Sequence, residues 1–570
     1  MVTTPAPPEW VLHPRSHPQR ALLLARELGA PPAIGHTLVN RGFAEPDAAR
    51  QFLSPVLDDL HDPHLLLGLD AALERIRRAL ADGEPILVQG DYDVDGITST
   101  YLLHSTLQEL GGAVRWRIPH RTRDGYGLTR AAVDEARRLG CRLIVTVDCG
   151  ITAVEPVAYA RSLGIDTVIT DHHEPAAILP DAASVVNPLR PGCPYPFKSL
   201  AGVGVTYKLV EALLRERGRT RRAEEFLDVV ALGTIADVVP LVGENRILAT
   251  LGLERLNRTR HLGLRALLER AGLAGRRLTS GQVAFVLAPR INAAGRMGDA
   301  GQALRLLLAR DEGEARACAD GLEDDNARRR SFDETASLEA AARVETDLGF
   351  PQCASILLWS ESWHPGVLGI VASRMVERFQ RPTVLVALDG GRGRGSGRSV
   401  PGLDLTRVLD GCSDLLESWG GHALAAGLVV ARERLPELRE RLEQLVRERV
   451  SPADRVKRVT YDAPLTLAEC DETLVEWVER LAPYGLDNPE PIYHLAHAEV
   501  EATSVVGGGK HLRLTVRDGS AQAEAIGFGL GGEAEAVRRA GCCALLFVPS
   551  RTEWNESTRL QLKLKGLRVP

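Results

Sequence analysis

Three aspartates at alternate positions stand out in the segment VQGDYDVDGITS, residues 88–99. Asp91, Asp93 and Asp95 follow the apolar run ILV at 86–88 and precede Gly96. Asp and Gly are common turn residues, so one interpretation is an ordinary turn at the end of a strand. Carboxylates this close repel one another unless a cation neutralises them. The spacing therefore favours a cation site over a plain turn, provided that the chain supplies further ligands.

More acidic residues follow other apolar runs. Asp148 comes directly after LIVTV, Asp171 comes directly after TVIT, and Asp237 follows VVALGTIA. His172 and His173 come next after Asp171. Ligands of open α/β sheets bind in the crevice outside the carboxyl ends of the strands, so we expect these side chains to meet there.

This set of residue types predicts a particular chemistry. Carboxylates with an imidazole suit Mg²⁺ or Mn²⁺, and the imidazole favours Mn²⁺. Two such ions about 3.5–4 Å apart need a bridging carboxylate, and together they activate a water and shield a phosphoryl transition state. Only one of two adjacent His easily faces the ions, so the other is free to meet substrate or donate a proton. The residues alone predict hydrolysis of a phosphoester that depends on two divalent cations.

The elements that must position these residues alternate along the chain. Strand-like runs alternate with helical patterns from about 84 to 240, which predicts a parallel α/β sheet with strands at 86–89, 114–118, 143–147 and 167–170. Residues 241–310 look mainly helical, and 311–349 are typical of one or two long helices. A second, smaller α/β unit begins at ASILLW, 354–359, and runs to about 450. Short strands with turns after 458 indicate a small β-barrel of OB type.

The composition limits the class of protein. The 570 residues predict two to four domains, and 44% hydrophobic with 25% charged residues is typical of a globular protein. No apolar run approaches a membrane span, and the N-terminus lacks the apolar core of a signal peptide, so we expect a cytoplasmic protein. The net charge of −6 indicates no global basic field, although local basic patches can still bind nucleic acid. Nine cysteines without a CxxC pair predict free thiols rather than a zinc knuckle.

Several longer motifs resemble those of one enzyme superfamily. GDYDVDG, TVDCG, TDHHE and LGTIADVVPL resemble the four successive motifs of the DHH phosphoesterases. RINAAGRMGDA (290–300) and LEDDNARRR (322–330) are similar to a fifth motif and a linker helix of its branch of bacterial single-strand DNA exonucleases. SWHPGVLGIVASRMVERFQRPTVLV (362–386) and GGHALAAGL (420–428) resemble the accompanying DHHA1 domain. The resemblance implies an N-terminal segment at 1–45, a DHH catalytic domain at 46–310, linker helices at 311–349, a DHHA1 domain at 350–452 and an OB-like nucleic-acid-binding domain at 453–570.

The resemblance also implies roles for individual residues. The implied metal ligands are Asp93, Asp95, Asp148, His172 and Asp237, with Asp148 as the bridge. Asp91 is either a further ligand or a support for the ligands, because related phosphoesterases place a His ligand near the position of Gln89 here. The implied catalytic groups near the scissile phosphate are His173, Asn292 and Arg296.

The substrate-binding residues come from two places. Arg290 belongs to the fifth motif, and Ser396, Arg398 and Ser399 belong to the segment GGRGRGSGRS, 390–399. We expect that segment to be a Gly-rich loop in which backbone and guanidinium approach a phosphate, with a plain solvated turn as the alternative. His422 in the GGH motif is expected to line the nucleotide cleft.

The implied activity is a 5′→3′ exonuclease on single-stranded DNA that releases 5′-mononucleotides and acts in DNA recombination and repair. One alternative is an oligonucleotide or cyclic-dinucleotide phosphodiesterase of the same superfamily, although such chains usually lack the β-domain and the RINAAGR motif. The other is a non-catalytic nucleic-acid-binding scaffold, which would have lost the ligands that this chain keeps. The expected partners are single-stranded DNA with a 5′ end, a single-strand-binding protein and a helicase, and the protein is expected to be a monomer away from the membrane.

Overall fold

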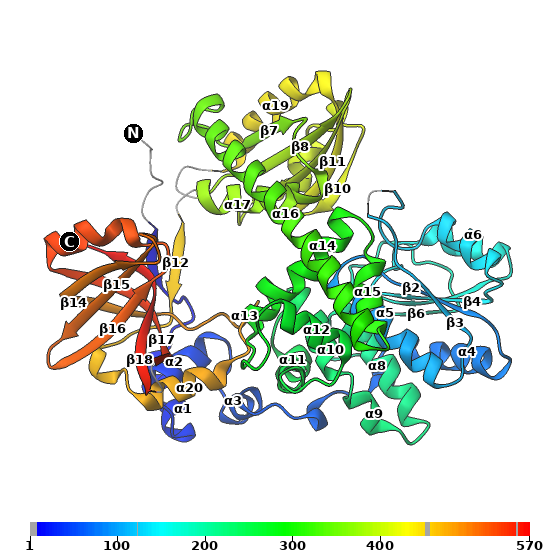
Figure 1. Cartoon of the computed structure of the whole chain (residues 1–570), viewed down its shortest axis with the longest axis horizontal. Coiled ribbons are helices and arrows are strands. Elements are labelled where there is room, and N and C mark those ends of the chain that lie inside the picture. The colour runs from blue at the N-terminus through cyan, green and yellow to red at the C-terminus, as the bar shows by residue number, and fades with distance from the viewer. Residues whose placement is uncertain (1–7, 122, 451–456, 555–556) are drawn as a thin grey trace. The chain divides into compact units, whose positions relative to one another are not determined.

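The computed structural model describes residues 8–121, 123–450, 457–554 and 557–570. Figure 1 shows the helices and strands in order along the chain. The chain divides into two compact units. The first comprises Met1–Trp10, Arg296–Asp299 and Gly321–Val459, and the second comprises Val11–Gly295, Ala300–Asp320 and Thr460–Pro570.

A five-stranded parallel sheet organises the first half of the chain. Its strand order is β3-β2-β4-β5-β6, with bounds β2 Ile86–Gln89, β3 Val114–Arg117, β4 Leu143–Val147, β5 Asp166–Thr170 and β6 Ser184–Val186. The four strands expected from the sequence are present, and β6 is an additional strand of three residues. Every residue of β2 and β4 is buried, as expected of strands covered on both faces. The helices between the strands are α5 Val94–Glu109, α6 Arg130–Arg138 and α7 Val154–Ser162, and α4 Leu69–Ala81 precedes the sheet.

Helices follow the sheet from residue 202 onward. Their bounds are α8 Gly202–Arg215, α9 Thr220–Glu224, α10 Leu227–Ala236, α11 Gly243–Leu256, α12 Leu262–Arg270, α13 Ser280–Gln282, α14 Ala288–Met297 and α15 Gly301–Leu308. Those from α11 to α15 confirm the expectation that residues 241–310 are mainly helical. A π-helical segment, η3 Val283–Leu287, joins α13 to α14. The predicted linker is one continuous helix of 36 residues, α16 Glu312–Asp347. None of the helices in the described ranges is both long enough and apolar enough to cross a membrane.

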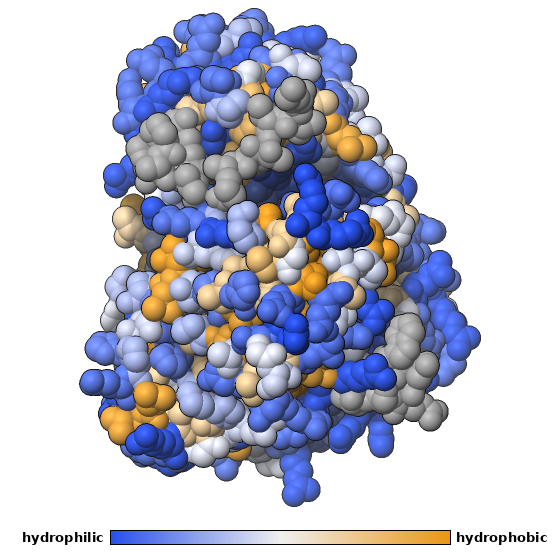
Figure 2. All heavy atoms as spheres, turned by 90° about the vertical axis from the view of Figure 1, so that its left-hand side faces the viewer, coloured by the Kyte–Doolittle hydropathy of each residue, from blue (hydrophilic) through white to orange (hydrophobic). Residues whose placement is uncertain are grey.

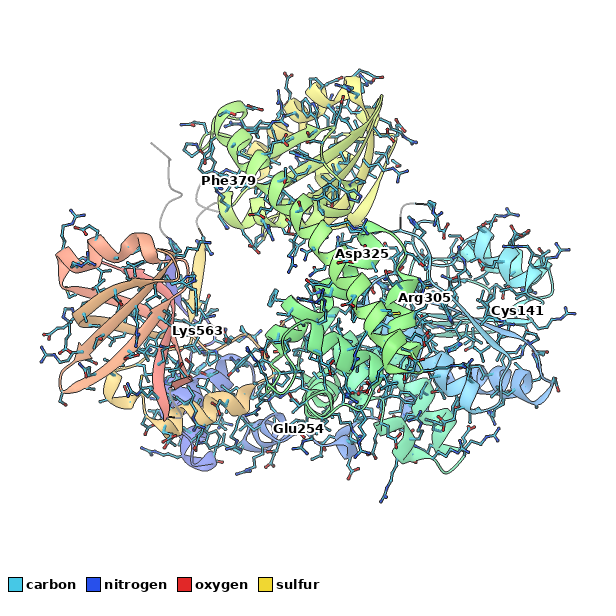
Figure 3. The ribbon with its side chains drawn as sticks, viewed as in Figure 1. Cys141, Glu254, Arg305, Asp325, Phe379 and Lys563 are labelled. Atoms are coloured by element: carbon cyan, nitrogen blue, oxygen red, sulfur yellow. The ribbon has the colours of Figure 1, made fainter. Side chains whose placement is uncertain are left out.

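The smaller α/β unit has a five-stranded sheet in the order β10-β11-β9-β8-β7. The strands are β7 Ile356–Ser360, β8 Thr383–Asp389, β9 Arg392–Arg398, β10 Ser418–His422 and β11 Ala425–Ala431, with helices α17 Leu368–Phe379, α18 Leu405–Asp410 and α19 Leu435–Arg449. Figure 3 labels Phe379 at the end of α17. The α/β unit beginning near residue 354 is thus confirmed, with α19 as its last helix.

The expectation of a Gly-rich loop at 390–399 was wrong, because Arg392–Arg398 forms strand β9 in the middle of this sheet. Strand β9 pairs antiparallel with β8 on one side and with β11 on the other. A Cβ added at Gly393, Gly395 or Gly397 would lie 2.6–2.8 Å from a packed side chain, namely Val386, Leu428 and Leu405 respectively. The alternate glycines therefore have the period of a strand whose inner face has no room for side chains.

The C-terminal part is a closed barrel, as the sequence predicted. Its main strands are β14 Tyr493–Val506, β15 His511–Asp518, β16 Ala521–Gly527, β17 Cys542–Trp554 and β18 Ser557–Arg568, and pairing of β14 with β17 closes the barrel. Lys563, labelled in Figure 3, lies on β18 and pairs with Glu490. On the face shown in Figure 2, hydrophilic residues surround small groups of apolar ones, which is typical of a water-exposed surface.

The N-terminal helices share a hydrophobic core with this barrel. Helices α1 Pro18–Leu28, α2 Pro32–Asn40 and α3 Pro46–Leu53 contribute Leu24, Leu38 and Phe52 to the cluster that also contains Tyr493 and Phe547. The hydroxyls of Thr37 and Tyr493 lie 3.0 Å apart within it. Residues from opposite ends of the chain therefore stabilise the same part of the structure.

Arg246 joins three segments of the chain, namely its own helix α11, the end of α3 at Phe52 and residues 480–482. Its guanidinium is buried and donates hydrogen bonds to the carbonyl oxygens of Phe52, Arg480, Leu481 and Ala482 at 2.6–3.1 Å. It also lies 3.8 Å from the centroid of the Phe52 ring. Burial lowers the pKa of Arg246 to about 9, so the group keeps its charge at neutral pH and depends on these acceptors.

We expect Arg246→Ala to destabilise the protein by about 3 kcal/mol or more, because four carbonyls lose a charged donor and a cavity remains. The apparent Tm should fall by roughly 6 °C or more, measured by differential scanning calorimetry. The matched control is Arg255→Ala on the same helix, whose side chain is 43% exposed, and it should shift the Tm by about 1–2 °C at most. Equal shifts for the two variants would contradict this role of Arg246.

Candidate active site

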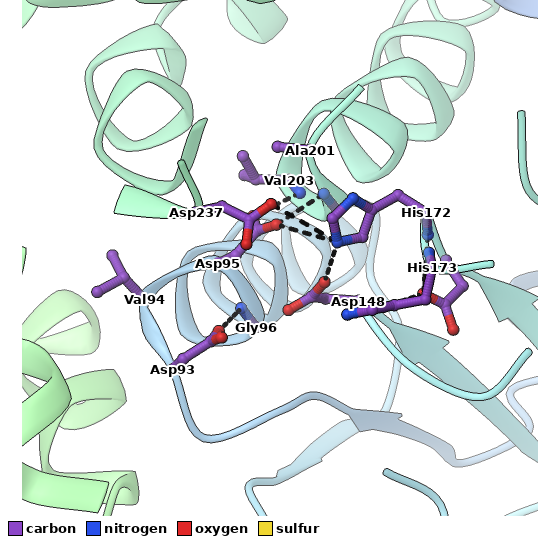
Figure 4. A network of polar contacts seen from close by, with 12 residues as sticks. Asp93, Val94, Asp95, Gly96, Asp148, His172, His173, Ala201, Val203 and Asp237 are labelled. Carbon is purple, nitrogen blue, oxygen red and sulfur yellow. Dashed lines mark hydrogen bonds and ion pairs between the residues drawn. The ribbon is translucent and has the colours of Figure 1, made fainter. Parts of the chain in front are cut away.

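A cluster of acidic side chains and one imidazole lies at the carboxyl ends of the parallel strands (Figure 4). The Nε2 atom of His172 lies 3.2 Å from Asp148 Oδ1, 3.6 Å from Asp237 Oδ2 and 3.9 Å from Asp95 Oδ2. Asp91, Asp93 and Asp148 form a second group whose ligand atoms lie within 4.8 Å of one another. The structure thus brings together Asp91 and all five residues that were expected to bind metal.

Helix termini position these carboxylates. Asp93 is the N-cap of α5, where its side chain accepts a hydrogen bond from the Gly96 amide at 3.0 Å, and Asp95 lies in the first turn. Strand β2 therefore delivers the first acidic motif directly onto a helix N-terminus, which favours negative charge. Asp237 follows the last residue of α10, which means that the fourth apolar segment before an acid is a helix rather than a strand.

Asp95 is held by the start of α8. Its two carboxylate oxygens accept hydrogen bonds from the amides of Gly202 and Val203, both at 2.7 Å. A Cβ at Gly202 would lie 2.4 Å from Asp148 Oδ1, so only glycine allows the helix to approach both acids. The sequence indicated no role for the segment AGVG at 201–204, because its function depends on backbone amides.

The backbone is strained beside two of the acids. Asp148 has a φ of 59° and Val238, directly after Asp237, has a φ of 61°. A β-branched residue in the left-handed region is a genuine outlier, and such strain persists only where the surrounding packing holds it. The strain turns the chain sharply at the points where Asp148 and Asp237 enter the cluster.

The acids shift one another's protonation. Burial, followed by the charges of neighbouring carboxylates, raises the pKa of Asp91, Asp148 and Asp237 well above the usual range and that of Asp95 to about 7. Burial, followed by the charge of His173, lowers the pKa of His172 to about 4. His172 is therefore neutral at physiological pH, which is the form that binds a metal.

His173 has a different environment from His172. Its Nδ1 lies 2.8 Å from Asp171 Oδ1 and 3.1 Å from the hydroxyl of Tyr126. Burial acts to lower the pKa of His173, but the hydrogen bond and charge of Asp171, together with Asp95 and Asp93, raise it above its usual value.

Asp171 orients His173 and is not among the residues grouped as potential metal ligands within the described ranges. Its Oδ1 accepts hydrogen bonds from the His172 and His173 amides, and its Oδ2 accepts one from the Ile151 amide. Sequence reasoning missed Tyr126, which also donates to the Asp148 carbonyl at 3.3 Å.

Asn292 and Arg290 lie on α14. Asn292 Oδ1 accepts a hydrogen bond from the Val94 amide at 3.2 Å, so Asn292 supports the start of α5, which carries Asp93 and Asp95. Arg290 Nη1 donates to the carbonyl of Val286 in the preceding turn at 2.6 Å. Arg296 belongs to the other compact unit, where it donates to the carbonyl of Gly366 at 3.0 Å.

The remaining predicted substrate residues lie around strand β9 of that unit. Arg398 Nη1 donates to Ser396 Oγ at 3.2 Å, and both side chains face Gly369 near the start of α17, where a Cβ would be 2.7 Å from Arg398 Nη2. Ser399, which was expected to bind substrate, is buried and donates its hydroxyl to the carbonyl of Leu403 at 2.7 Å. His422 ends the exposed strand β10.

The site's residues fit divalent cations. Asp91 Oδ1, Asp148 Oδ1, Asp237 Oδ2 and His172 Nε2 are buried atoms with no hydrogen-bond partner among the described residues. Buried polar atoms are normally satisfied, so four such atoms converging in one place indicate a missing cation. Oxygen ligands with one imidazole are the donors that Mg²⁺ and Mn²⁺ accept.

The fold and site define a DHH phosphoesterase. Residues 85–234 match the model of the DHH family N-terminal domain, residues 352–448 match the DHHA1 domain, and residues 461–566 match the RecJ OB domain. The single-stranded-DNA-specific exonuclease RecJ of Bacillus subtilis (strain 168) is 39% identical over 549 residues, which cover 96% of this chain and 69% of the relative. The chain belongs to the RecJ family.

Solved structures agree with this assignment. A crystal structure of RecJ from Thermus thermophilus in complex with Mn²⁺ has a TM-score of 0.85 at 32% identity and covers 99% of this chain and 80% of that one. Its complex with Mg²⁺ has a TM-score of 0.78 at 30% identity, with 99% and 78% covered. Together with the acidic cluster, these relatives indicate that this chain binds divalent metal.

The raised pKa values predict how stability depends on pH. Between about pH 4 and 7 the folded protein holds protons on the acids that the unfolded chain has lost, so without metal its stability falls as pH rises through this range. In EDTA, the Tm should be lower at about pH 8 than at about pH 6. Excess Mn²⁺ should raise the Tm more at the higher pH, because fewer protons compete for the ligands.

The measurement is a thermal shift series with Asp148→Asn as the control. This variant lacks one titrating acid, so both the pH dependence and the Mn²⁺ shift should be smaller. A larger Mn²⁺ shift at the lower pH than at the higher pH in the wild type would show that the acids do not compete with protons for the metal.

Proposed function

We propose that this chain degrades single-stranded DNA from the 5′ end and releases 5′-mononucleotides, as an exonuclease of DNA recombination and repair. The observation that carries the proposal is the convergence of five acids and His172 at the strand ends, in a chain whose relative is a single-stranded-DNA-specific exonuclease. The domain limits that we propose remain 1–45, 46–310, 311–349, 350–452 and 453–570.

We infer two divalent cations, with Mn²⁺ favoured. Asp148 belongs to two of the three potential ligand groups, one with His172 and His173 and one with Asp91 and Asp93, which supports its role as the bridge. Asp95, His172 and Asp237 would complete the set of ligands of one ion, and Asp93 and Asp91 would complete that of the other. When bound, such ions provide the hydroxide-like nucleophile and the charge stabilisation that phosphodiester hydrolysis requires.

The protein's own groups would supply the remaining functions. His173, held by Asp171 and Tyr126, has a raised pKa and can donate a proton to the departing 3′ oxygen. Asn292 keeps the loop that carries Asp93 in place. Arg290, Arg296 and His422 are proposed to contact the strand close to the scissile phosphate.

The pair Arg398 and Ser396 is proposed to bind the terminal 5′-phosphate. Arg398 is within 3.2 Å of Ser396, and Gly369 leaves space beside both near the N-terminus of α17. A guanidinium, a hydroxyl and a helix N-terminus are the groups that recognise phosphate. Ser399 supports the turn after β9 through Leu403.

The alternatives fit the chain less well. Oligonucleotide and cyclic-dinucleotide phosphodiesterases of this superfamily usually lack a β-domain such as the barrel of this chain, and a scaffold without activity would be marked by lost ligands, whereas the acids are present here. We further propose that the protein is a monomer and that it is located in the cytoplasm. Its proposed protein partners are a single-strand-binding protein and a helicase.

The activity is tested with single-stranded DNA labelled at the 5′ end, offered beside a dinucleotide and a cyclic dinucleotide, with Mn²⁺ or with EDTA. We expect Mn²⁺-dependent release of mononucleotides from single-stranded DNA and little hydrolysis of the other two. Asp148→Ala should lower the rate more than tenfold, a loss above about 1.4 kcal/mol, while its far-UV circular dichroism is unchanged. Preferential hydrolysis of a dinucleotide would overturn the proposal.

A second experiment tests recognition of the end. Arg398→Ala should lower kcat/KM on 5′-phosphorylated DNA by about 10- to 100-fold, the effect of losing a charged hydrogen bond. Cleavage of 5′-hydroxyl DNA should change much less, so the preference for a phosphorylated end disappears. The matched control is Arg394→Ala on the same strand. Equal losses on both substrates would instead place Arg398 on the internal backbone or in the framework.

A further inference from the structure

Four exposed arginines gather on two neighbouring turns of the helical region. Arg258 and Arg260 follow α11, and Arg276 and Arg277 precede α13. We call these four residues the arginine patch. Within the described ranges, the structure records no ion pair for any of them, whereas three arginines on the adjoining helices are paired: Arg255 with Glu224, Arg265 with Glu312 and Arg270 with Asp320.

The patch has a fixed framework. The amide of Leu278 donates to Asn257 Oδ1 at 2.7 Å, which joins the two turns directly. The hydroxyl of Thr259 donates to Asp228 Oδ2 at 2.6 Å, and a capping box at Thr279 begins α13. The backbone that carries the four guanidinium groups is therefore held in place before any ligand arrives.

The balance of charge favours a polyanion. The carboxylate on the preceding turn of α11 is Glu254, labelled in Figure 3, and no ion pair among the described residues joins it to Arg258 four residues later. Four cations close together repel one another, which is unfavourable unless something neutralises them. The patch consists of guanidinium groups alone, which bind phosphates of the backbone. Contacts to phosphate carry no sequence information, so the patch would bind a strand of any sequence.

The helix that starts at the patch leads to the metal site. It runs from α13 through η3 to α14, and Asn292 on α14 contacts the loop that carries Asp93. From Thr279 to Asn292 this helix rises about 20 Å. Midway, Phe285 is 82% exposed on the π-helical segment, a feature common at functional sites.

We propose that the arginine patch binds the phosphate backbone of the substrate strand within about six nucleotides of the metal centre, since about 20 Å corresponds to six nucleotides at the 3.4 Å rise of a stacked helical strand and to fewer in an extended single strand. This inference rests on the proposed nuclease function and deepens it. The patch is a second contact for the strand, separate from the groups at the scissile phosphate, and it increases affinity for strands long enough to reach it.

The test compares two substrate lengths. The double variant Arg276→Ala/Arg277→Ala is assayed on 5′-phosphorylated strands of about three and about thirty nucleotides, because the shorter strand does not span the distance of about 20 Å to the patch even when it is extended. We expect KM for the long strand to rise about tenfold with kcat unchanged, and both constants for the short strand to stay as in the wild type. The matched control is Arg137→Ala/Arg138→Ala, an exposed pair on α6, which should match the wild type on both lengths.

Binding is measured separately from hydrolysis. With Asp148→Ala in the background, fluorescence anisotropy gives the affinity for a fluorescent strand of about thirty nucleotides at several salt concentrations. The arginine double variant should bind more weakly, and the slope of log K against log salt should become shallower by about 0.7 per lost phosphate contact. Glu254→Gln should strengthen binding, since it removes the neighbouring negative charge.

The outcomes separate the two proposals. If the wild type fails to hydrolyse DNA, the proposed function fails, while the anisotropy series still shows whether the patch binds a strand. Equal losses on short and long strands, or no loss on either, would overturn the role of the patch. An unchanged salt slope in the double variant would do the same.

Discussion

The crowding of buried carboxylates around His172 is the constraint on which the rest of the site depends. Asp91, Asp95, Asp148 and Asp237 are brought together although burial, and after it the charges of neighbouring carboxylates, raises the pKa of each. A fold can hold such a cluster only if packing elsewhere outweighs the repulsion or a cation removes it. Here the fold contributes two backbone amides to Asp95 and leaves the other acids for metal.

Neighbouring donors decide what each acid does. Asp148 and Asp171 both follow a buried parallel strand, so the sheet presents them in equivalent positions. Asp171 is surrounded by three amides and His173, which satisfy its charge and make it an orienting group. Asp148 Oδ1 meets the Nε2 of His172 and no hydrogen-bond donor among the described residues, which leaves it available to a cation. The same residue type after the same kind of strand thus serves two purposes.

The arginines that would bind the DNA strand differ in the same way from those of the framework, because the two groups differ in whether a carboxylate neutralises their charge. Some arginines pair with acids inside the framework, as the largely buried Arg75 does with Asp166 and Arg117 with Glu135. The guanidinium groups of the arginine patch have no such pair within the described part of the chain, and Arg398 shares its hydrogen bonds with Ser396 and a carbonyl. The protein has a net charge of −6, so its affinity for DNA must come from such local groups rather than from its overall charge.

The sequence by itself determined the sheet, the helical region, the barrel and the set of acids around the site, because buried strands and the residues that follow them have a local signature. Periodicity identified 86–89 and 143–147 as strands, and the acids after them could be assigned to one edge of the sheet. Even the glycine strand β9 carried a period-two signal that its turn-like composition concealed.

Only the tertiary structure decided which groups meet. The amides of Gly202 and Val203 reach Asp95 from more than a hundred residues away, and Tyr126 reaches His173 across the strand ends. Backbone amides have no identity in a sequence, and contacts between distant segments leave no periodic pattern in it. Arg246 shows the same limit, since its four carbonyl acceptors come from residues near positions 52 and 481 that only the packed core places beside it.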